Sequence, residues 1–210
     1  MSRCFSEQFL AETISIIQAI DALSIESCAT GLATIRDQGG RLFILGVGGS
    51  AGHASHAVND FRKICNFEAY APTDNVSELT ARTNDDGWDT VFVEWLRTSR
   101  LTGRDAVLVF SVGGGDSIRD ISANLVAALS YASEVGSPIF GIIGRDGGFT
   151  ATKATAWIHI PPLVPGRITP HTEGICAVIW HLLATHPRLS ATNTKWESVA
   201  VSPGAKTPSG

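Results

Sequence analysis

Residues 41–52 read RLFILGVGGSAG, and this stretch decides the fold. Its first part, residues 41–47, is a short and almost continuous apolar run, which is typical of a strand buried on both faces of a parallel sheet. Glycines and a serine follow at once, ahead of a helical pattern over residues 51–63. The stretch therefore predicts a buried strand, a tight glycine-rich loop and a helix.

The same pattern of apolar run and helical stretch recurs along the chain. The predicted strands cover residues 41–47, 106–111, 138–144 and 156–160, with a weaker one at 67–70, and the predicted helices cover 51–63, 87–100, 118–135 and 171–185. Alternation of strand and helix predicts the α/β class, with a parallel sheet between layers of helices. In such a sheet, ligands bind at the carboxyl ends of the strands.

Three segments are expected along the chain. Helical spacing of apolar residues over 5–23 and 25–37 predicts an N-terminal helical arm, residues 1–39, which packs against the body or another subunit. The sheet-forming domain spans residues 40–188. Residues 189–210 are rich in Ala, Thr, Ser, Pro and Gly, which predicts a flexible tail.

Composition excludes several classes of protein. Of the 210 residues, 44% are apolar and 17% are charged, which argues against disorder, and the net charge of −4 argues against a nucleic-acid partner. No apolar run has the length of a membrane helix, and the first residues lack the apolar core of a signal peptide. The four scattered cysteines form no C-x-x-C pair. We expect a cytoplasmic protein with reduced thiols and no membrane partner.

The loop Gly46-Val47-Gly48-Gly49-Ser50 offers an anion site, because glycines admit close approach to the backbone and a helix N-terminus follows. Two alternatives stay open for it. In the first, the loop is a plain turn without a ligand. In the second, it is the dinucleotide-binding fingerprint of an oxidoreductase, formed by Gly46, Gly48 and Ala51 with Glu68 further on.

The helix after this loop carries His56 and Asp60, four residues apart and therefore on one face. An imidazole and a carboxylate at this spacing can bind a divalent metal or serve as a catalytic pair. The alternative is a structural histidine. The polar pair disfavours a dinucleotide site, because a helix that only packs on its sheet needs no such face.

A second loop, Ser111-Val112-Gly113-Gly114-Gly115-Asp116-Ser117, also follows a buried strand. Hydroxyls beside glycines suit a phosphate monoester, and the absence of a Gly-Lys-Ser/Thr sequence excludes a nucleoside triphosphate loop. A third loop, residues 144–148, is a further contact or a turn.

The last predicted helix places Glu173, Ala177 and His181 on one stripe. His181 stands among large apolar residues, so it is either a hydrogen-bonded core histidine or a group that faces the site. Glu173 on the same stripe favours the second interpretation. With His56 and Asp60, these residues make two imidazoles and two carboxylates, enough for a tetrahedral zinc site.

Over residues 5–186 the chain resembles the sugar isomerase (SIS) domain family, and within it the phosphoheptose isomerase branch. The resemblance rests on the loops 46–50, 111–115 and 145–148, on Asn84-Asp85, and on His56, Asp60, Glu173 and His181. The branch pattern differs at several positions. Val47 stands where an asparagine is usual, Asp60 replaces a glutamate, Glu173 replaces a glutamine, and the 111–117 loop has an extra residue.

The resemblance implies an SIS-type three-layer sandwich with a five-stranded parallel sheet, in a homotetramer. It implies interconversion of sedoheptulose 7-phosphate and D-glycero-D-manno-heptose 7-phosphate, the first step towards activated heptose. It also implies zinc, or another divalent metal, held by His56, Asp60, Glu173 and His181, with His171 as a possible substitute. Substrate binding falls to Gly48, Gly49, Ser50, Asp85, Ser111, Gly113, Gly114 and Ser117.

Isomerisation of an aldose to a ketose passes through an enediolate, and it needs a base, a second proton-transfer group and charge stabilisation. We expect Asp60 or Glu173 as the base, His181 as its partner and the metal as the Lewis acid. The rival from another class is a non-catalytic SIS module that binds a sugar phosphate or a partner protein. The presence of both His56 and His181 disfavours that rival.

Overall fold

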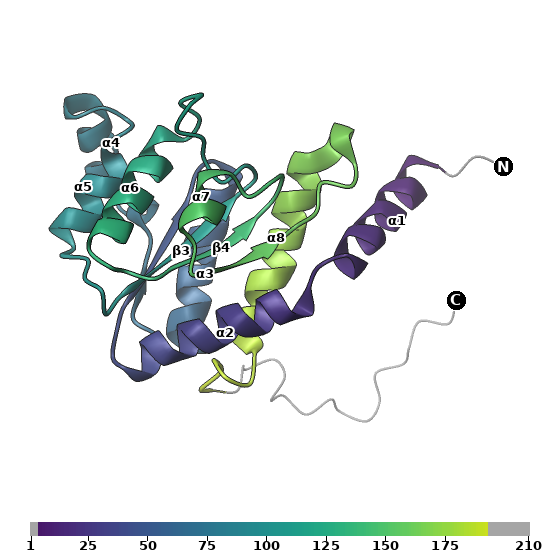
Figure 1. Ribbon diagram of the computed structural model, residues 1–210, viewed down its shortest axis with the longest axis horizontal. Coiled ribbons are helices and arrows are strands. Elements are labelled where there is room, and N and C mark those ends of the chain that lie inside the picture. Colours follow the sequence, from purple (N-terminus) through teal and green to yellow (C-terminus); the bar gives the residue numbers. More distant parts are fainter. Residues whose placement is uncertain (1–3, 193–210) are drawn as a thin grey trace, which may run out of the picture.

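A five-stranded parallel sheet forms the centre of the computed structural model, which describes residues 4–192 (Figure 1). The strand order is β2-β1-β3-β4-β5, and every neighbouring pair is parallel. The strands are β1 (Leu42–Gly46), β2 (Ala69–Tyr70), β3 (Ala106–Ser111), β4 (Ile139–Ile143) and β5 (Ala156–His159). The predicted α/β class and the five-stranded parallel sheet are confirmed.

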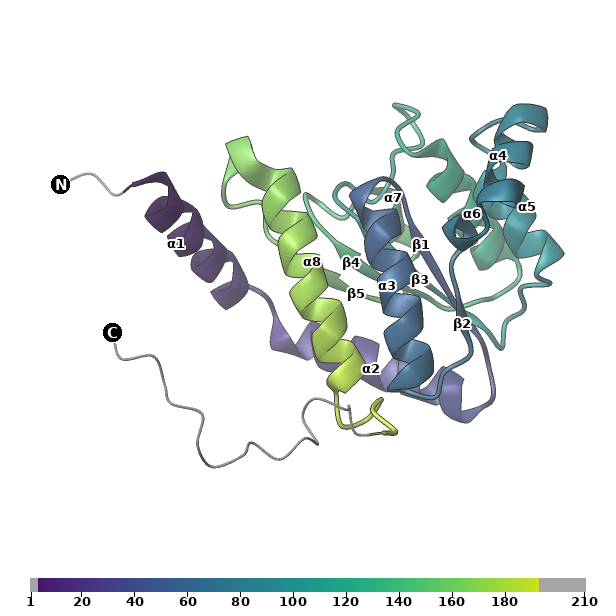
Figure 2. The same cartoon turned by 180° about the vertical axis from the view of Figure 1, so that it is seen from behind.

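Helices cover both faces of the sheet. They are α1 (Phe5–Gln18), α2 (Ala22–Asp37), α3 (Gly49–Lys63), α4 (Val76–Asp85), α5 (Val91–Thr98), α6 (Ala123–Glu134), α7 (Gly148–Lys153) and α8 (Ile168–Thr185), with short 3-10 turns at Pro72–Asp74 and Pro165–Arg167. Figure 2 shows α3 and α8 next to one another on one face, with α5 and α6 on the far side of the sheet.

Alternation along the strands divides the core into two halves. Leu42 and Ile44 of β1 pack on the side of α2, α3 and α8, whereas Phe43 and Leu45 pack on the side of α5 and α6. Successive side chains of a strand point to opposite faces, so an unbroken apolar run is what a strand covered on both faces requires. This is the physical reason why the apolar run at 41–47 predicted a strand with helices on both faces.

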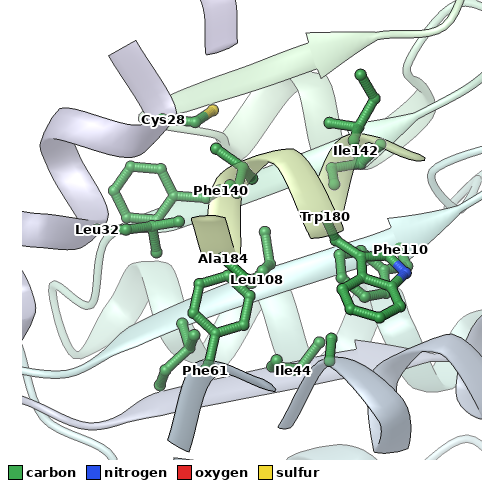
Figure 3. Close-up of a cluster of buried hydrophobic side chains, with 14 of the residues drawn as sticks. Cys28, Leu32, Ile44, Phe61, Leu108, Phe110, Phe140, Ile142, Trp180 and Ala184 are labelled. Atoms are coloured by element: carbon green, nitrogen blue, oxygen red, sulfur yellow. The ribbon is translucent and has the colours of Figure 1, made fainter. Parts of the chain in front are cut away.

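The larger half of the core joins three helices to the sheet, and Figure 3 shows its centre. Leu32 of α2, Phe61 of α3 and Trp180 of α8 are all buried against strand residues such as Phe110 and Phe140. Each fully buried side chain of this size stabilises the fold by about 1.5–3 kcal/mol. Burial also raises the pKa of the Cys28 thiol to about 12, so this cysteine acts as an apolar core residue.

Two helical predictions were inaccurate. The helix expected over 87–100 is shorter, α5, and a separate helix, α4, precedes it. The ten residues of α4 include only three apolar ones, Val76, Leu79 and Ala81, which is too short a pattern for periodicity to detect. Asn75 caps the helix by accepting a hydrogen bond from the backbone N–H of Glu78. The helix expected over 118–135 begins only at Ala123, because residues 116–121 form a separate excursion.

The two helices of the predicted arm differ in their packing. Six residues of α2 are buried in the core, whereas Ile16 is the one buried residue of α1. Contact of α1 with the body includes Glu12, whose carboxylate accepts a hydrogen bond from Arg167 Nε at 2.8 Å, and Phe9, whose ring stacks on His171. Thus α2 belongs to the layer of α3 and α8, and α1 is an attachment to it.

The predicted tail lies mostly beyond the described residues. The stretch that is described, 189–192, packs on the body: Leu189 is fully buried, and Arg36 donates hydrogen bonds to the carbonyls of Arg188 and Leu189. The division into an arm, a domain and a tail stays a proposal.

Within residues 4–192, no single helix combines the length and apolar character needed to cross a membrane. Only α1 and α2 taken together meet the length, and their axes bend by 65° at the break between them.

Candidate functional site

A cavity of about 680 Å³ opens at the carboxyl ends of the central strands. Four loops contribute to it, the ones that follow β1, β3, β4 and β5, as expected for the ligand site of a parallel sheet. Its lining comprises Val47, Ser50, Phe110, Ser111, Val112, Gly113, Gly115, Asp116, Arg119, Ile121, Ser122, Leu125, Arg145, Asp146, Gly148, Pro162, Ile168 and Glu173.

The first loop brings the N-terminus of α3 to this cavity. Gly48 has φ +62° and stands at the N-cap of the helix, a conformation that favours glycine. A side chain at Gly49 would collide with the carboxylate of Glu173, so Glu173 of α8 lies directly over the start of α3. A helix N-terminus attracts negative charge. The N-terminus of α3 carries the lining serine Ser50 and lies beside the carboxylate of Glu173.

The second loop is rigid and presents a hydroxyl. Ser111 Oγ accepts a hydrogen bond from the backbone N–H of Gly114 at 2.9 Å, which leaves the Ser111 proton available to a ligand. The carbonyls of Gly114 and Gly115 accept hydrogen bonds from Thr150 and Phe149 of α7. The loop is therefore held by its neighbour before any ligand arrives.

Ser122 is a lining residue that the sequence analysis missed. The excursion 116–121 shifts the start of α6, so Ser122 at its N-cap lines the cavity, whereas the predicted Ser117 is not among the lining residues. Ser122 has φ +54° and makes no capping hydrogen bond. The usable signal was a serine directly before an apolar helical stretch, a common N-cap pattern.

The third loop contributes two charged side chains to the cavity, Arg145 and Asp146. Arg145 has φ +46°, and its carbonyl oxygen lies 2.5 Å from Nε2 of His159. The loop 144–148, for which the sequence left a ligand contact or a plain turn open, thus lines the cavity. Gly48, Gly49 and Gly114 shape the loops but do not line the cavity. Asp85, at the end of α4, is likewise outside the lining, and its Oδ1 accepts a hydrogen bond from Asn84.

A second cluster lies where α3 and α8 meet. His56, Asp60 and His181 each offer a ligand atom, and these atoms lie within 4.8 Å of one another. Asp60 Oδ2 is 3.9 Å from His56 Nε2 and 3.8 Å from His181 Nε2. The two imidazoles are about half exposed, and Asp60 is 13% exposed between them. The spacing predicted from His56 and Asp60 thus forms a group that can hold a divalent metal.

Hydrogen bonding orients His181 within this cluster. Its Nδ1 lies 2.7 Å from the carbonyl oxygen of Ala177, which can only accept, so Nδ1 carries the proton. In the neutral ring Nε2 then carries the free lone pair, and this nitrogen faces Asp60. Trp180 stacks on the His181 ring and fixes its plane. His181 is therefore not the buried core histidine that its apolar neighbours in the sequence allowed.

The four predicted metal ligands do not meet at one point, because they lie at different positions along α3 and α8. Gly49 meets Glu173 where both helices begin, and Asp60 meets His181 further along, so α3 and α8 run parallel. Glu173 precedes His181 by eight residues, which is about 12 Å along a helix. Glu173 consequently borders the cavity, and the cluster of ligand atoms contains the other three residues.

His171, the possible substitute ligand, points the other way. It is 3% exposed and lies against α1, with Nε2 3.1 Å from Glu12 Oε2 and Nδ1 3.3 Å from Thr13 Oγ1. It is thus outside the cluster of ligand atoms and instead helps to attach α1 to α8.

Several curated proteins are similar to the chain. It is 33% identical over 164 residues to a phosphoheptose isomerase of Solidesulfovibrio magneticus, covering 76% of this chain and 74% of that protein. It is 34% identical over 151 residues to the phosphoheptose isomerase of Trichlorobacter lovleyi, covering 69% and 71%. It is also 32% identical over 155 residues to the lincomycin biosynthesis protein LmbN of Streptomyces lincolnensis. That alignment covers 69% of this chain and spans about half, 54%, of LmbN. No protein-family model matches the chain.

Solved structures agree with the sequence comparison. The phosphoheptose isomerase GmhA of Neisseria gonorrhoeae has a TM-score of 0.74 at 25% identity, over 85% of this chain and 95% of that one. A phosphoheptose isomerase of Francisella tularensis has the same fold, with a TM-score of 0.72 at 22% identity, over 86% and 92%.

Proposed function

The chain belongs to the phosphoheptose isomerase family, and from this premise we propose that it interconverts sedoheptulose 7-phosphate and D-glycero-D-manno-heptose 7-phosphate. This reaction would supply the first step towards activated heptose. One observation carries the proposal: the parallel pair α3 and α8 has a cavity suited to an anion at one end and a His/Asp cluster further along. A sugar phosphate needs both, because its charged group and its reacting carbons are at opposite ends.

The cavity is the proposed site of the phosphate. Hydroxyls of Ser50, Ser111 and Ser122 line it, together with backbone of the glycine loops and the start of α3. Hydroxyl and amide donors around a helix N-terminus are a common solution for phosphate groups. Glu173 lies at the edge of this site, over Gly49, where its carboxylate would accept hydrogen bonds from sugar hydroxyls.

Asp60 and His181 are the proposed proton-transfer pair. Isomerisation moves a proton between adjacent carbons and another between adjacent oxygens, so the two catalytic groups must reach neighbouring atoms. Asp60 Oδ2 and His181 Nε2 are 3.8 Å apart, which meets this requirement. The Ala177 carbonyl keeps the proton of neutral His181 on Nδ1 and leaves Nε2 to accept or return a proton.

The residues present also fit a divalent metal such as zinc. His56, Asp60 and His181 would hold it, since two imidazoles and one carboxylate are the donor set of many catalytic zinc sites that keep a position open for substrate. A metal held through His181 Nε2 would occupy the lone pair that otherwise takes a proton, so metal binding and proton transfer are alternative roles of Asp60 and His181. When bound, the metal would supply Lewis-acid stabilisation of negative charge on substrate oxygens.

Turnover of sedoheptulose 7-phosphate by the purified protein tests the proposal, with Asp60→Asn and His181→Ala as the informative variants. We expect each variant to lose about 10²- to 10⁴-fold in kcat, the usual contribution of an acid–base group. His186→Ala is the matched control, because His186 follows the same helix and bonds to Glu26 rather than to the cluster. Wild-type turnover in both informative variants would show that the assignment is wrong.

We further propose that the protein works as a homotetramer in the cytoplasm. Apolar side chains on α1 and α8 are exposed in the single chain and would be covered by sister subunits: Phe5, Leu10, Ile14, Ile17, Val178 and Leu182. Free cysteines, including the exposed Cys4, suit a reducing compartment. Sedimentation equilibrium measures the subunit number, and a monomer would contradict the proposal.

A further inference from the structure

The excursion 116–121 is a closed unit that ends at the cavity. Asp116 and Ile121 exchange both backbone hydrogen bonds, at 2.9 and 3.1 Å, so the chain leaves and returns at one point. Both of these end residues line the cavity, and so does Arg119 between them. The excursion thus places a cationic side chain beside Ser122 and the second glycine loop.

Asp116 holds Arg119 in place. Its Oδ1 accepts hydrogen bonds from the backbone N–H groups of Ile118 and Arg119, both at 2.9 Å, and its Oδ2 accepts from Arg119 Nε at 2.6 Å. Across residues 4–192, no hydrogen bond is found for the two terminal amino groups of Arg119. A guanidinium fixed through Nε and free at its terminal nitrogens is well suited to bind an oxyanion with two parallel hydrogen bonds.

Arg145 brings a second guanidinium to the same cavity. A Cβ added to Gly113 would contact Arg145 Cδ at 3.6 Å, so the Arg145 side chain lies along the second loop. No ion-pair partner for Arg145 is found in the described part of the chain. Arg145 and Ser122 both have positive φ although neither is glycine, and such backbone conformations concentrate at functional sites.

The composition of the second loop explains why a cation is needed there. Residues 112–115, Val-Gly-Gly-Gly, contribute no side-chain donor between Ser111 and the excursion. The other charged lining residues are acidic: Asp116 binds Arg119, Asp146 accepts a backbone hydrogen bond from Gly148, and Glu173 lies over Gly49. Two arginines are the only cationic side chains of the described lining, and their charge offsets the repulsion between these acids and a dianionic group.

We propose that Arg119 and Arg145 bind the phosphate of the substrate, and that Asp116 is a positioning residue that acts through Arg119. This inference rests on the proposed function, since it takes the substrate to be a sugar phosphate. The excursion then determines specificity, because it adds a guanidinium that recognises the charged end of the sugar.

The experiment measures kcat and KM for sedoheptulose 7-phosphate, and the binding of inorganic phosphate by calorimetry, in Arg119→Gln and Arg145→Gln. A charge-assisted hydrogen bond contributes equally to ground and transition states when it is remote from the reacting carbons. We therefore expect KM to rise about tenfold or more in each variant, with kcat within about threefold, and phosphate affinity to fall in parallel. Arg119→Lys should recover part of the loss, because it restores the charge but not the planar fork.

Arg97→Gln is the matched control. Arg97 pairs with Glu94 three residues away on α5, as Arg119 pairs with Asp116, but it does not line the cavity. Its KM and phosphate affinity should equal those of the wild type. Values for Arg119→Gln that match this control, or a loss confined to kcat, would overturn the proposal.

The positioning role of Asp116 is tested by a double-mutant cycle. Asp116→Asn alone should raise KM by about twofold to fivefold, since Arg119 stays but loses its orientation. Added to Arg119→Gln, the same change should have no further effect; an independent, additive effect would contradict a role through Arg119. If the wild type fails to convert sedoheptulose 7-phosphate, the proposed function fails, while the phosphate titration of the same variants still decides whether the arginines form an anion site.

Discussion

The cavity at the strand ends and the His/Asp cluster between α3 and α8 are built in opposite ways. The cavity is framed by loops whose glycines meet other loops at close range, such as Gly114 against Gly147 and Gly148 against Gly113. The cluster consists of side chains on the surface of two finished helices, with His56 57% exposed and His181 48% exposed. Hence the proposed phosphate site depends on the fold itself, whereas the proposed catalytic cluster is added to its surface.

A direct consequence is that substitutions in the two regions should have different costs. A change in the glycine loops alters the packing of neighbouring loops, so it should lower the free energy of unfolding. A change in the cluster removes polar atoms that water already reaches, so it should alter activity with little effect on stability.

The largest effect is expected for Gly114→Ala. Gly114 has φ +72°, and a Cβ would overlap the carbonyl oxygen of Gly147, so backbone has to move as well as adopt a strained conformation. We expect a loss of about 3 kcal/mol or more in the free energy of unfolding, measured by denaturant titration.

Gly136→Ala is the control for backbone conformation alone, because Gly136 has φ +73° and open space around it. It should cost about 1 kcal/mol. Equal losses in the two variants would show that crowding between the glycine loops is unimportant.

The next largest effect is expected in the His/Asp cluster. His56→Ala should reduce kcat by about 10²-fold or more, with a melting temperature close to that of the wild type. His53→Ala, one turn earlier on α3 and outside the cluster, should keep its activity. A His56 variant that melts far below the wild type would mean that the cluster supports the fold after all.

Metal binding should be visible as a stability change confined to the cluster. Zinc at 100 times its dissociation constant should stabilise the folded wild type by about 2.7 kcal/mol, and a chelator should reverse this. The measurement is the melting temperature with and without added zinc. Asp60→Asn should respond much less, and an equal response in that variant would place the metal elsewhere.

The smallest effect is a pH-dependent loosening of α1, which lies outside both the cavity and the His/Asp cluster. Hydrogen bonds from Arg167, and then from His171, hold the pKa of the Glu12 carboxyl at about 2, below its ordinary 4.5. A lowered pKa means that this contribution to the docking of α1 is fully present above pH 4.5 and is lost as the pH falls towards 2. After correction for the intrinsic exchange rate, the protection of the α1 amides should therefore fall between pH 5 and pH 3.

Glu12→Gln provides the comparison for this prediction. It lacks the titrating carboxylate, so after correction for intrinsic exchange its α1 amides should be equally protected at both pH values. Wild-type protection that is independent of pH would contradict a role for the Glu12 carboxylate.

Local patterns predicted much of the fold and part of the site. The apolar run at 41–47 predicted a strand covered on both faces, and glycines after the strands predicted loops at the cavity. His56 and Asp60 were paired by helical spacing alone, because residues four apart always share a helix face. These properties depend only on nearby residues, so one sequence suffices to find them.

Other features escaped prediction for a physical reason. The helix α4 buries none of its residues and carries only three apolar side chains in ten, too few for periodicity to detect. Ser122 replaces Ser117 in the cavity because Asp116 and Ile121 close the intervening residues into an excursion, which depends on backbone pairing rather than on any residue pattern.

Local patterns in the sequence were enough to predict a parallel α/β protein with glycine-rich loops at the strand ends, because periodicity and glycine placement act within a few residues. The division of the four predicted ligands depends on how α3 and α8 pack, which local patterns do not encode. A shared stripe means only that Glu173 and His181 lie on the same face of α8. Their separation along α8, together with the parallel course of α3, places Glu173 at the cavity and His181 beside Asp60. Spacing along a chain gives the face of a helix, but the helix packed against that face determines which residues meet.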